Sequence, residues 1–184
     1  MLHVRRQKQI REKVELLLAE ALIAKPRVLP EHIASYYGIV VRVEPIDEDV
    51  SGFLVRHGEN SKAIIGVNSL QPPKRRRFTL AHELGHYFLH TSHKHQEVHV
   101  DRAKFLVKWR DKDSSKGVDH EEIEANWFAA ELLMPATFLI KDIARFGGFD
   151  LSHDDDSVVE ELAARYDVSV QAMTYRLSNL ERLA

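Results

Sequence analysis

Two stretches of the chain carry apolar residues at the three- and four-residue spacing of helices. In residues 5–24 the apolar positions fall on one helical face, basic residues lie among the others, and Pro26 ends the pattern. Residues 77–90, RFTLAHELGHYFLH, are apolar around most of the helix, which predicts a buried helix. Between them, Pro30 suits a first helical position and Gly38 a C-terminal cap, so a short helix is predicted there.

Three short runs rich in β-branched residues lie between these helices, at residues 39–44, 52–57 and 62–67. Polar turn residues separate the runs, so they predict three antiparallel strands. A further extended piece is indicated by the apolar residues Val98, Val100, Phe105 and Val107.

The second half of the chain is predicted to be helical. The stretch EEIEANWFAA at residues 121–130 continues to Pro135, which breaks it, and another helix is predicted over residues 136–146. Ser157 and Glu160 have the spacing of a capping box for one helix, and Ser169 caps a second. The last two helices therefore have helix-turn-helix spacing.

These elements predict an α+β fold, in which a small, about three-stranded antiparallel sheet packs on helices and a helix-turn-helix-like pair follows. A length of 184 residues is enough for one domain with its own core. We expect residues 1–148 to form that domain, and residues 149–184 to be a C-terminal helical segment packed on it.

Composition restricts the possible surroundings and partners. The formal charge of −2 argues against general affinity for nucleic acids, and the absence of cysteine excludes disulfides and thiolate ligands. The most apolar early run, residues 14–24, is interrupted by two glutamates and is followed by no cleavage-like signal. We expect a cytoplasmic protein that does not associate with membranes. Nothing in the sequence specifies an oligomeric state.

The predicted helix at residues 77–90 contains the pattern His-Glu-x-x-His, formed by His82, Glu83 and His86. A four-residue spacing puts the two imidazoles on one face, about 6 Å apart along the axis, where both can bind one zinc ion. Zinc lowers the pKa of bound water to about 7, and a neighbouring carboxylate such as Glu83 can then take its proton as general base. Burying these three residues without a ligand would leave polar groups unsatisfied, so we favour a metal site.

Two histidines leave the metal short of a third protein ligand. The metzincin continuation is excluded, because Leu89 and Ser92 stand where it requires glycine and histidine. His90 lies about 12 Å from His82 along the axis, too far to share an ion with it. In the next helical stretch Glu122 is a candidate ligand, and Asn126 one turn later can orient an imidazole. Glu121 and Glu124 are expected to be solvated, with Glu124 the rival ligand.

RFTLAHELGHYFLH followed by EIEANWFAAELLMP resembles the ImmA/IrrE family of zinc metallopeptidases, and the resemblance extends from about residue 30 to residue 180. It implies a compact zincin-like peptidase with one zinc per chain, often encoded beside a helix-turn-helix repressor that it cleaves or inactivates. EIEAN is also similar to the Glu-x-x-x-Asp ligand helix of thermolysin-like enzymes, which favours Glu122. Asn126 departs from that pattern, because an amide orients a histidine without supplying charge.

Two further requirements of a peptidase have candidates in the sequence. Zinc peptidases commonly use a second electrophile to stabilise the oxyanion, and the candidates are His99, His120, Tyr175 and Arg176. An edge strand can also hydrogen-bond an extended substrate, and residues 63–67 are the candidate, although an ordinary core strand fits them equally well.

Three functions follow. The first is a zinc endopeptidase that cleaves a protein substrate, a helix-turn-helix repressor as the resemblance implies. The second is a zinc-binding regulatory protein that acts by binding its partner without cutting it. The third, direct DNA binding, is disfavoured because residues 150–184 carry eight acidic residues against three arginines, whereas phosphate contacts dominate DNA affinity.

Overall fold

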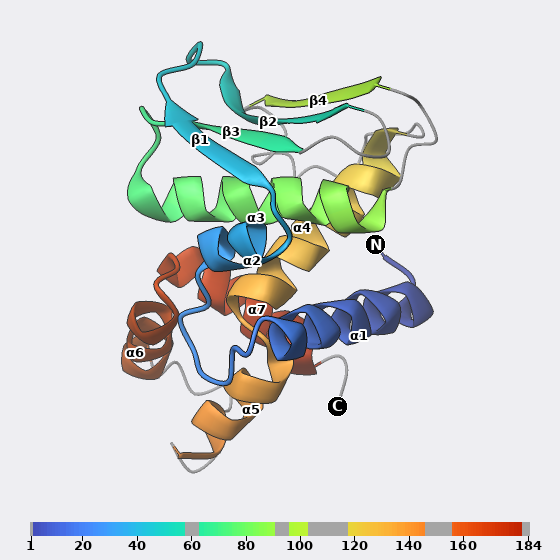
Figure 1. The fold of residues 1–184 in the computed structure, drawn as a ribbon. Coiled ribbons are helices and arrows are strands. Elements are labelled where there is room, and N and C mark those ends of the chain that lie inside the picture. The colour runs from blue at the N-terminus through green and yellow to red at the C-terminus, as the bar shows by residue number, and fades with distance from the viewer. Residues whose placement is uncertain (1, 58–62, 91–95, 103–117, 146–155, 182–184) are drawn as a thin grey trace.

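The structure is a computed structural model that describes residues 2–57, 63–90, 96–102, 118–145 and 156–181 (Figure 1). The helices are α1 (Val4–Glu20), α2 (Pro30–Tyr36), α3 (Pro73–Leu89), α4 (Val118–Leu133), α5 (Ala136–Arg145), α6 (Asp156–Tyr166) and α7 (Val170–Glu181). The strands are β1 (Val40–Glu44), β2 (Val50–His57), β3 (Ile64–Asn68) and β4 (Gln96–Arg102). The prediction of an α+β fold is therefore confirmed.

The sheet differs from the predicted three antiparallel strands. It has four described strands in the order β1-β3-β2-β4, and β1 pairs with β3 in parallel. Alternating apolar residues identify a strand but not its neighbour, and burial decides the order here. β3 is buried along most of its length and lies inside the sheet, whereas β1 is largely exposed and lies at the edge. Of the two alternatives for residues 63–67, the structure excludes the edge strand and shows the core strand. β4 contains Val98 and Val100 of the predicted extended piece, whereas Phe105 and Val107 lie outside the described residues.

One face of the sheet packs on α3. The strand registers align Leu54 with Ile65 on one side and with His99 on the other, so these side chains share a face. Leu54 and Ile65 join the core with Leu84 of α3. Figure 1 shows the sheet along one side of α3 and most of the other helices on the opposite side. α3 is therefore covered from both sides.

α3 and α4 cross in direct backbone contact. A Cβ atom added at Gly85 would lie 2.9 Å from the Cα atom of Ala125 and 3.0 Å from its carbonyl oxygen. Such contact requires a residue without a side chain at the crossing. As Glu122 and Asn126 stand on either side of Ala125 in α4, the crossing brings them next to the histidines of α3.

The C-terminal helices share the core with the rest of the chain. Arg176 of α7 is buried and pairs with the equally buried Glu131 of α4 at 2.6 Å, and its Nε donates to the carbonyl oxygen of Met134. Ser169 caps α7 by accepting a hydrogen bond from the amide of Ala172, whereas Ser157 lies inside α6, which already begins at Asp156. No helix within the described residues combines the length and apolar character needed to cross a bilayer.

Replacing Gly85 by alanine tests the helix crossing. Alanine would add about 1 kcal/mol of intrinsic helix preference, but its methyl group would push the α4 backbone away, and overpacking typically costs about 1–3 kcal/mol. We expect Gly85→Ala to lower the thermal midpoint of the metal-free protein by several degrees, at about 2–4 °C per kcal/mol for a chain of this size. A midpoint equal to or above that of the wild type would show that the two helices are not held in contact.

Candidate metal centre

The two histidines and the glutamate of the His-Glu-x-x-His pattern lie in the buried middle of α3. His82 and Glu83 are fully buried and His86 is nearly so. The Nε2 atoms of His82 and His86 lie 3.0 Å apart, on the face of α3 that meets α4. The spacing of four residues thus brings two imidazole nitrogens together, as one turn of helix requires.

Glu122 of α4 completes a group of three possible metal ligands. Its Oε2 lies 3.3 Å from His82 Nε2, and its Oε1 lies 3.3 Å from His86 Nε2. One ligand atom from each of the three residues falls within 4.8 Å of the others. Two neutral imidazoles and a carboxylate in this arrangement could hold a divalent cation such as zinc.

Buried oxygen atoms without hydrogen bonds in the described structure are consistent with a cation at this place. Neither carboxylate oxygen of the buried Glu83 accepts a well-aligned hydrogen bond from the described residues, and the same is true of Glu122 Oε2. Buried carboxylates are normally hydrogen-bonded, so these oxygens require a partner that the described residues do not supply. A metal ion could bind Glu122, and a water molecule on that ion could donate a hydrogen bond to Glu83. The residues present are therefore suited to a metal.

His99 connects Glu83 to Glu122 from the sheet side. Its Nε2 lies 2.9 Å from Glu122 Oε1, and its Nδ1 lies 3.4 Å from Glu83 Oε2. Its ring stacks on that of His86 with centroids 3.7 Å apart. His99 reaches this position because it occupies the inner face of β4, opposite Leu54.

The local electrostatics favour the protonation states that a metal ligand needs. Burial lowers the pKa of His86 to about 3, so its imidazole is neutral at pH 7 and keeps a lone pair. Burial raises the pKa of Glu122, but its close contacts with His82, His86 and His99 outweigh burial and hold this pKa well below its usual range. Burial lowers the pKa of His99, but its contacts with Glu122 and Glu83 prevail and raise it to about 10.

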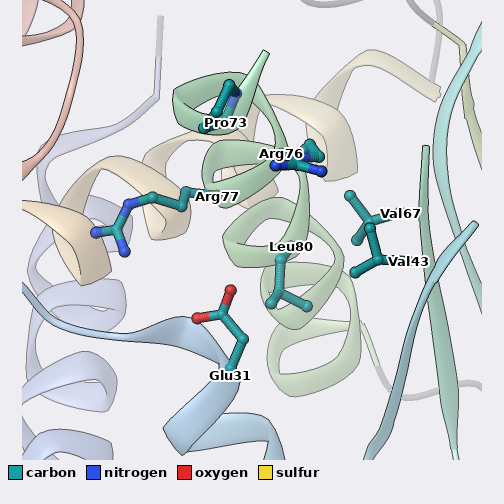
Figure 2. Close-up of a pocket in the computed structure, with 7 residues that line it drawn as sticks. All are labelled: Glu31, Val43, Val67, Pro73, Arg76, Arg77 and Leu80. Carbon is teal, nitrogen blue, oxygen red and sulfur yellow. The ribbon is translucent and has the colours of Figure 1, made fainter. Parts of the chain in front are cut away.

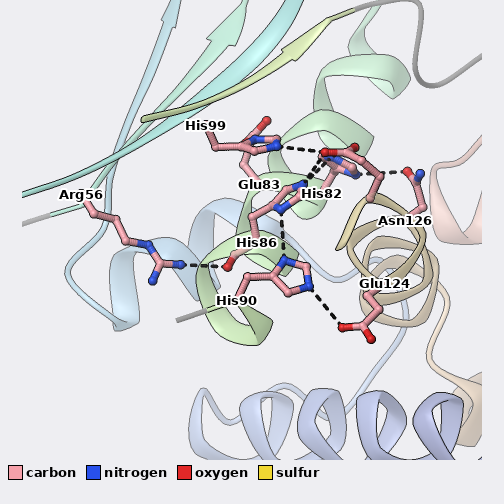
Figure 3. A network of polar contacts seen from close by, with 9 residues as sticks. Arg56, His82, Glu83, His86, His90, His99, Glu124 and Asn126 are labelled. Carbon is pink, nitrogen blue, oxygen red and sulfur yellow. Dashed lines mark hydrogen bonds and ion pairs between the residues drawn. The ribbon is translucent and has the colours of Figure 1, made fainter. Parts of the chain in front are cut away.

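A second layer of side chains orients the two α3 histidines (Figure 3). His82 Nδ1 lies 3.1 Å from Asn126 Oδ1. His86 Nδ1 lies 3.1 Å from His90 Nδ1, and His90 Nε2 lies 3.1 Å from Glu124 Oε2. If Nδ1 of His86 carries the proton, it donates to His90, which then donates from Nε2 to Glu124. That set of tautomers leaves Nε2 of His86 as a lone pair facing Glu122.

Glu124 takes part in this layer and is not solvated as the sequence suggested. Arg6 of α1 donates from Nε to Glu124 Oε1 at 2.8 Å, and the glutamate side chain is only 17% exposed. The partner Arg6 lies 118 residues away in the chain, so spacing along α4 could not reveal it. Glu121 is exposed, as expected.

The four oxyanion candidates lie in different places. His99 is brought to Glu83 and Glu122, whereas His120 is exposed in the first turn of α4. Tyr175 is 43% exposed on α7, and Arg176 is enclosed by its contacts with Glu131 and Met134. Among these four candidates, His99 is the one whose contacts in the described structure reach the group of ligands.

Two glycines that shape the site were missed by the sequence analysis. Gly85 permits the contact of α3 and α4, and a Cβ at Gly52 would lie 2.6 Å from Thr79 Cγ2 and 3.6 Å from Glu83 Oε1. β2 can therefore approach α3 directly above Glu83. Glycine inside a helix or strand is a signal of close backbone approach, and it was available at both positions.

Comparison with known proteins assigns the chain to a family. Residues 34–178 match the peptidase family M78, described as the IrrE N-terminal-like domain. The chain belongs to this family. The ImmA/IrrE resemblance of the two motifs is thereby confirmed.

Individual relatives extend this result. The chain is 33% identical over 120 residues to the radiation response metalloprotease IrrE of Deinococcus deserti, covering 62% of this chain and 36% of that protein. It is 31% identical over 138 residues to the uncharacterized immunity region protein 2 of Bacillus phage phi105, covering 69% of this chain and 78% of that protein. The chain thus spans about a third of the length of the IrrE protein.

A solved structure shares the fold. A transcriptional regulator of Mycobacterium tuberculosis superposes with a TM-score of 0.59 at 18% identity, covering 93% of this chain and 46% of the other. At this identity the likeness shows the fold alone.

A pair of matched substitutions on α4 tests which carboxylate binds metal. Glu122→Gln removes the charge next to His82 and His86, and we expect it to weaken zinc binding by roughly 100-fold or more, whereas Glu124→Gln should weaken it by about tenfold or less. Both changes keep the side-chain size, and competition titration against a chelator measures the difference. If Glu124→Gln had the larger effect, the ligand would have to be reassigned.

Proposed function

We propose that this chain is a zinc-dependent endopeptidase that hydrolyses a peptide bond in a protein substrate. His82, His86 and Glu122 would hold one zinc ion per chain, and Glu83 would be the general base. The observation that carries the proposal is the position of Glu83. It is a fully buried carboxylate without a hydrogen bond from the described residues, beside a group of metal ligands, in a chain of a peptidase family.

The chemistry divides between the metal and the residues around it. When bound, zinc would acidify a water molecule and polarise the scissile carbonyl group. Glu83 would accept the proton of the attacking water on a carboxylate oxygen and later pass it to the leaving amine. Its burial beneath β2 at Gly52 keeps bulk water away from this proton transfer. Asn126 and His90 would hold the two imidazoles in place through their Nδ1 atoms.

His99 is our choice for the second electrophile. The ring nitrogens of His99 contact Glu122 and Glu83, so its N–H groups lie beside the group of ligands. A developing oxyanion would form there and could accept a hydrogen bond from one of them. β4 also contributes in a second way, because it is an edge strand of the described sheet. An extended substrate could pair with its free edge next to His99.

The proposed substrate is a helix-turn-helix repressor. Support comes from the resemblance to the ImmA/IrrE family, from the relative named a radiation response metalloprotease, and from the phage relative named an immunity region protein. A role in direct DNA binding receives little support, because two of the three arginines in the C-terminal segment are committed elsewhere. Arg176 is buried against Glu131, and Arg165 donates to Asp142 at 2.7 Å.

Glu83→Gln separates the peptidase from a protein that acts by binding. The amide keeps the shape of the side chain but cannot accept a proton, so we expect zinc content and partner binding to persist while cleavage falls by roughly 10²- to 10⁴-fold. The measurement is incubation with the candidate repressor, followed by gel electrophoresis and mass spectrometry of fragments. If wild type and variant release the repressor from its operator equally well and neither produces a fragment, the protein acts by binding.

His99→Gln tests the second electrophile. We expect kcat to fall by about 10²- to 10³-fold with little change in KM and with zinc retained, because the hydrogen bond would form only as the oxyanion develops. His120→Gln is the control, since His120 is exposed at the start of α4. Equal kinetics for His99→Gln and the wild type would remove His99 from the mechanism.

A further inference from the structure

A large cavity lies between α3, α4 and α7, next to the candidate metal ligand His82. Its volume is about 750 Å³, within the range of sites that bind ligands. Its walls come from the first turns of α3, the C-terminal half of α4 and the N-terminal half of α7. This volume exceeds that of any single side chain, so the cavity can take a peptide segment of several residues.

Two residues connect the cavity to the candidate metal ligands. Asn126 lines the cavity and also contacts His82 Nδ1 at 3.1 Å. Phe78 lines it as well, and its ring stacks on that of His82 with centroids 6.5 Å apart. A segment bound in the cavity would therefore lie one side chain away from His82, close to the scissile bond of the proposed reaction.

The chemistry of the lining defines what would fit. Most of the wall is apolar, as with Phe78, Leu133, Met134 and Ala172. Lys74 and Arg75 are the only charged residues that line it in the described structure, and both are positive. Lys74 lies at the junction of α3 and α7, where its ammonium group donates to the carbonyl oxygen of Val168 at 2.7 Å. An apolar side chain with a neighbouring carboxylate complements such a lining.

A second cavity has different properties. It measures about 260 Å³, lies between α2, β1 and α3, and is lined by Glu31 as well as Arg76 and Arg77 (Figure 2). Arg77 is committed to the carbonyl oxygen of Val28 and to Asp167. With charges of both signs and a smaller volume, this cavity does not select an anionic segment, but it provides a matched control.

We propose that the cavity of α3, α4 and α7 is a specificity subsite for the protein substrate. It receives a segment that presents a large apolar side chain, such as leucine, methionine or phenylalanine, next to an aspartate or glutamate. This assignment rests on the proposed endopeptidase function, since it identifies the class of substrate segment held beside the cleaved bond.

The test uses a pool of dodecapeptides randomised at every position, digested by the zinc-loaded protein and read by mass spectrometry. We expect large apolar residues and Asp or Glu to be enriched about threefold to tenfold close to the cleaved bond. Lys74→Glu should shift the charge preference toward Lys and Arg. Ala172→Trp should fill the cavity and remove the apolar preference. Arg76→Glu makes the same charge change two residues further along α3, on a residue that lines the other cavity, and should leave the preference unchanged.

Zinc content and thermal midpoints of all variants show whether each is folded, and Ala172→Trp remains informative if Lys74→Glu is not. Cleavage without selection, or a preference that Lys74→Glu and Ala172→Trp leave intact, would overturn the subsite. So would binding of 8-anilinonaphthalene-1-sulfonate that Lys74→Glu abolishes while peptide selection is unchanged, since the cavity would then be a small-molecule site.

If the wild type cleaves neither the peptides nor the candidate repressor, the endopeptidase proposal fails on its own. The subsite is then judged by which members of the same pool Glu83→Gln protein retains. Retention of apolar, acidic peptides that is lost on adding Lys74→Glu supports it, and unselective retention overturns it.

Discussion

The contact between α3 and α4 is the constraint on which the site depends. Because Gly85 has no side chain, the backbone of α4 can approach until Ala125 touches α3, and this places Glu122 within 3.3 Å of both histidine nitrogens. A helix separation larger by one methyl group would open the group of ligands. The glycine costs about 1 kcal/mol of helix preference relative to alanine, and packing of the two helices with the sheet offsets that cost. The geometry of the centre is therefore a consequence of helix packing, and the same contact also brings Asn126 to His82.

The site is held by residues far apart in the chain. Arg6 of α1 contacts Glu124, Glu124 contacts His90, and His90 contacts His86, so three side chains connect the first helix of the chain to a candidate metal ligand. On the other side, Asn126 holds His82 through a neutral amide. One histidine is thus backed by a carboxylate through a second imidazole and the other by an amide, which makes the two differ in basicity. The C-terminal helices close the arrangement, because the buried pair of Arg176 and Glu131 attaches α7 to α4 and so forms the far wall of the large cavity.

The sheet shows where local patterns stop being informative. The β-branched runs located three strands within two residues of their observed positions, since alternation and turn residues are local signals. They did not show that β1 and β3 are parallel, or that β3 is interior, because partner choice depends on which strand has the more apolar sides to bury. The consequence was functional. The strand considered as a possible edge strand is buried between two others, and the edge strand that carries His99 is β4.

The sequence by itself determined the helix that carries His82, Glu83 and His86, and a four-residue spacing on that helix puts both imidazoles on one face. It also indicated the family, through two motifs that lie within the residues 34–178 matched by the family model. It narrowed the acidic candidates to Glu122 and Glu124 by their positions on α4. Only the tertiary structure separated these two, and only it distinguished His99 from His120, Tyr175 and Arg176. The physical reason is the same in each case: the deciding contacts join residues from different helices and strands, so they exist only after the chain has packed.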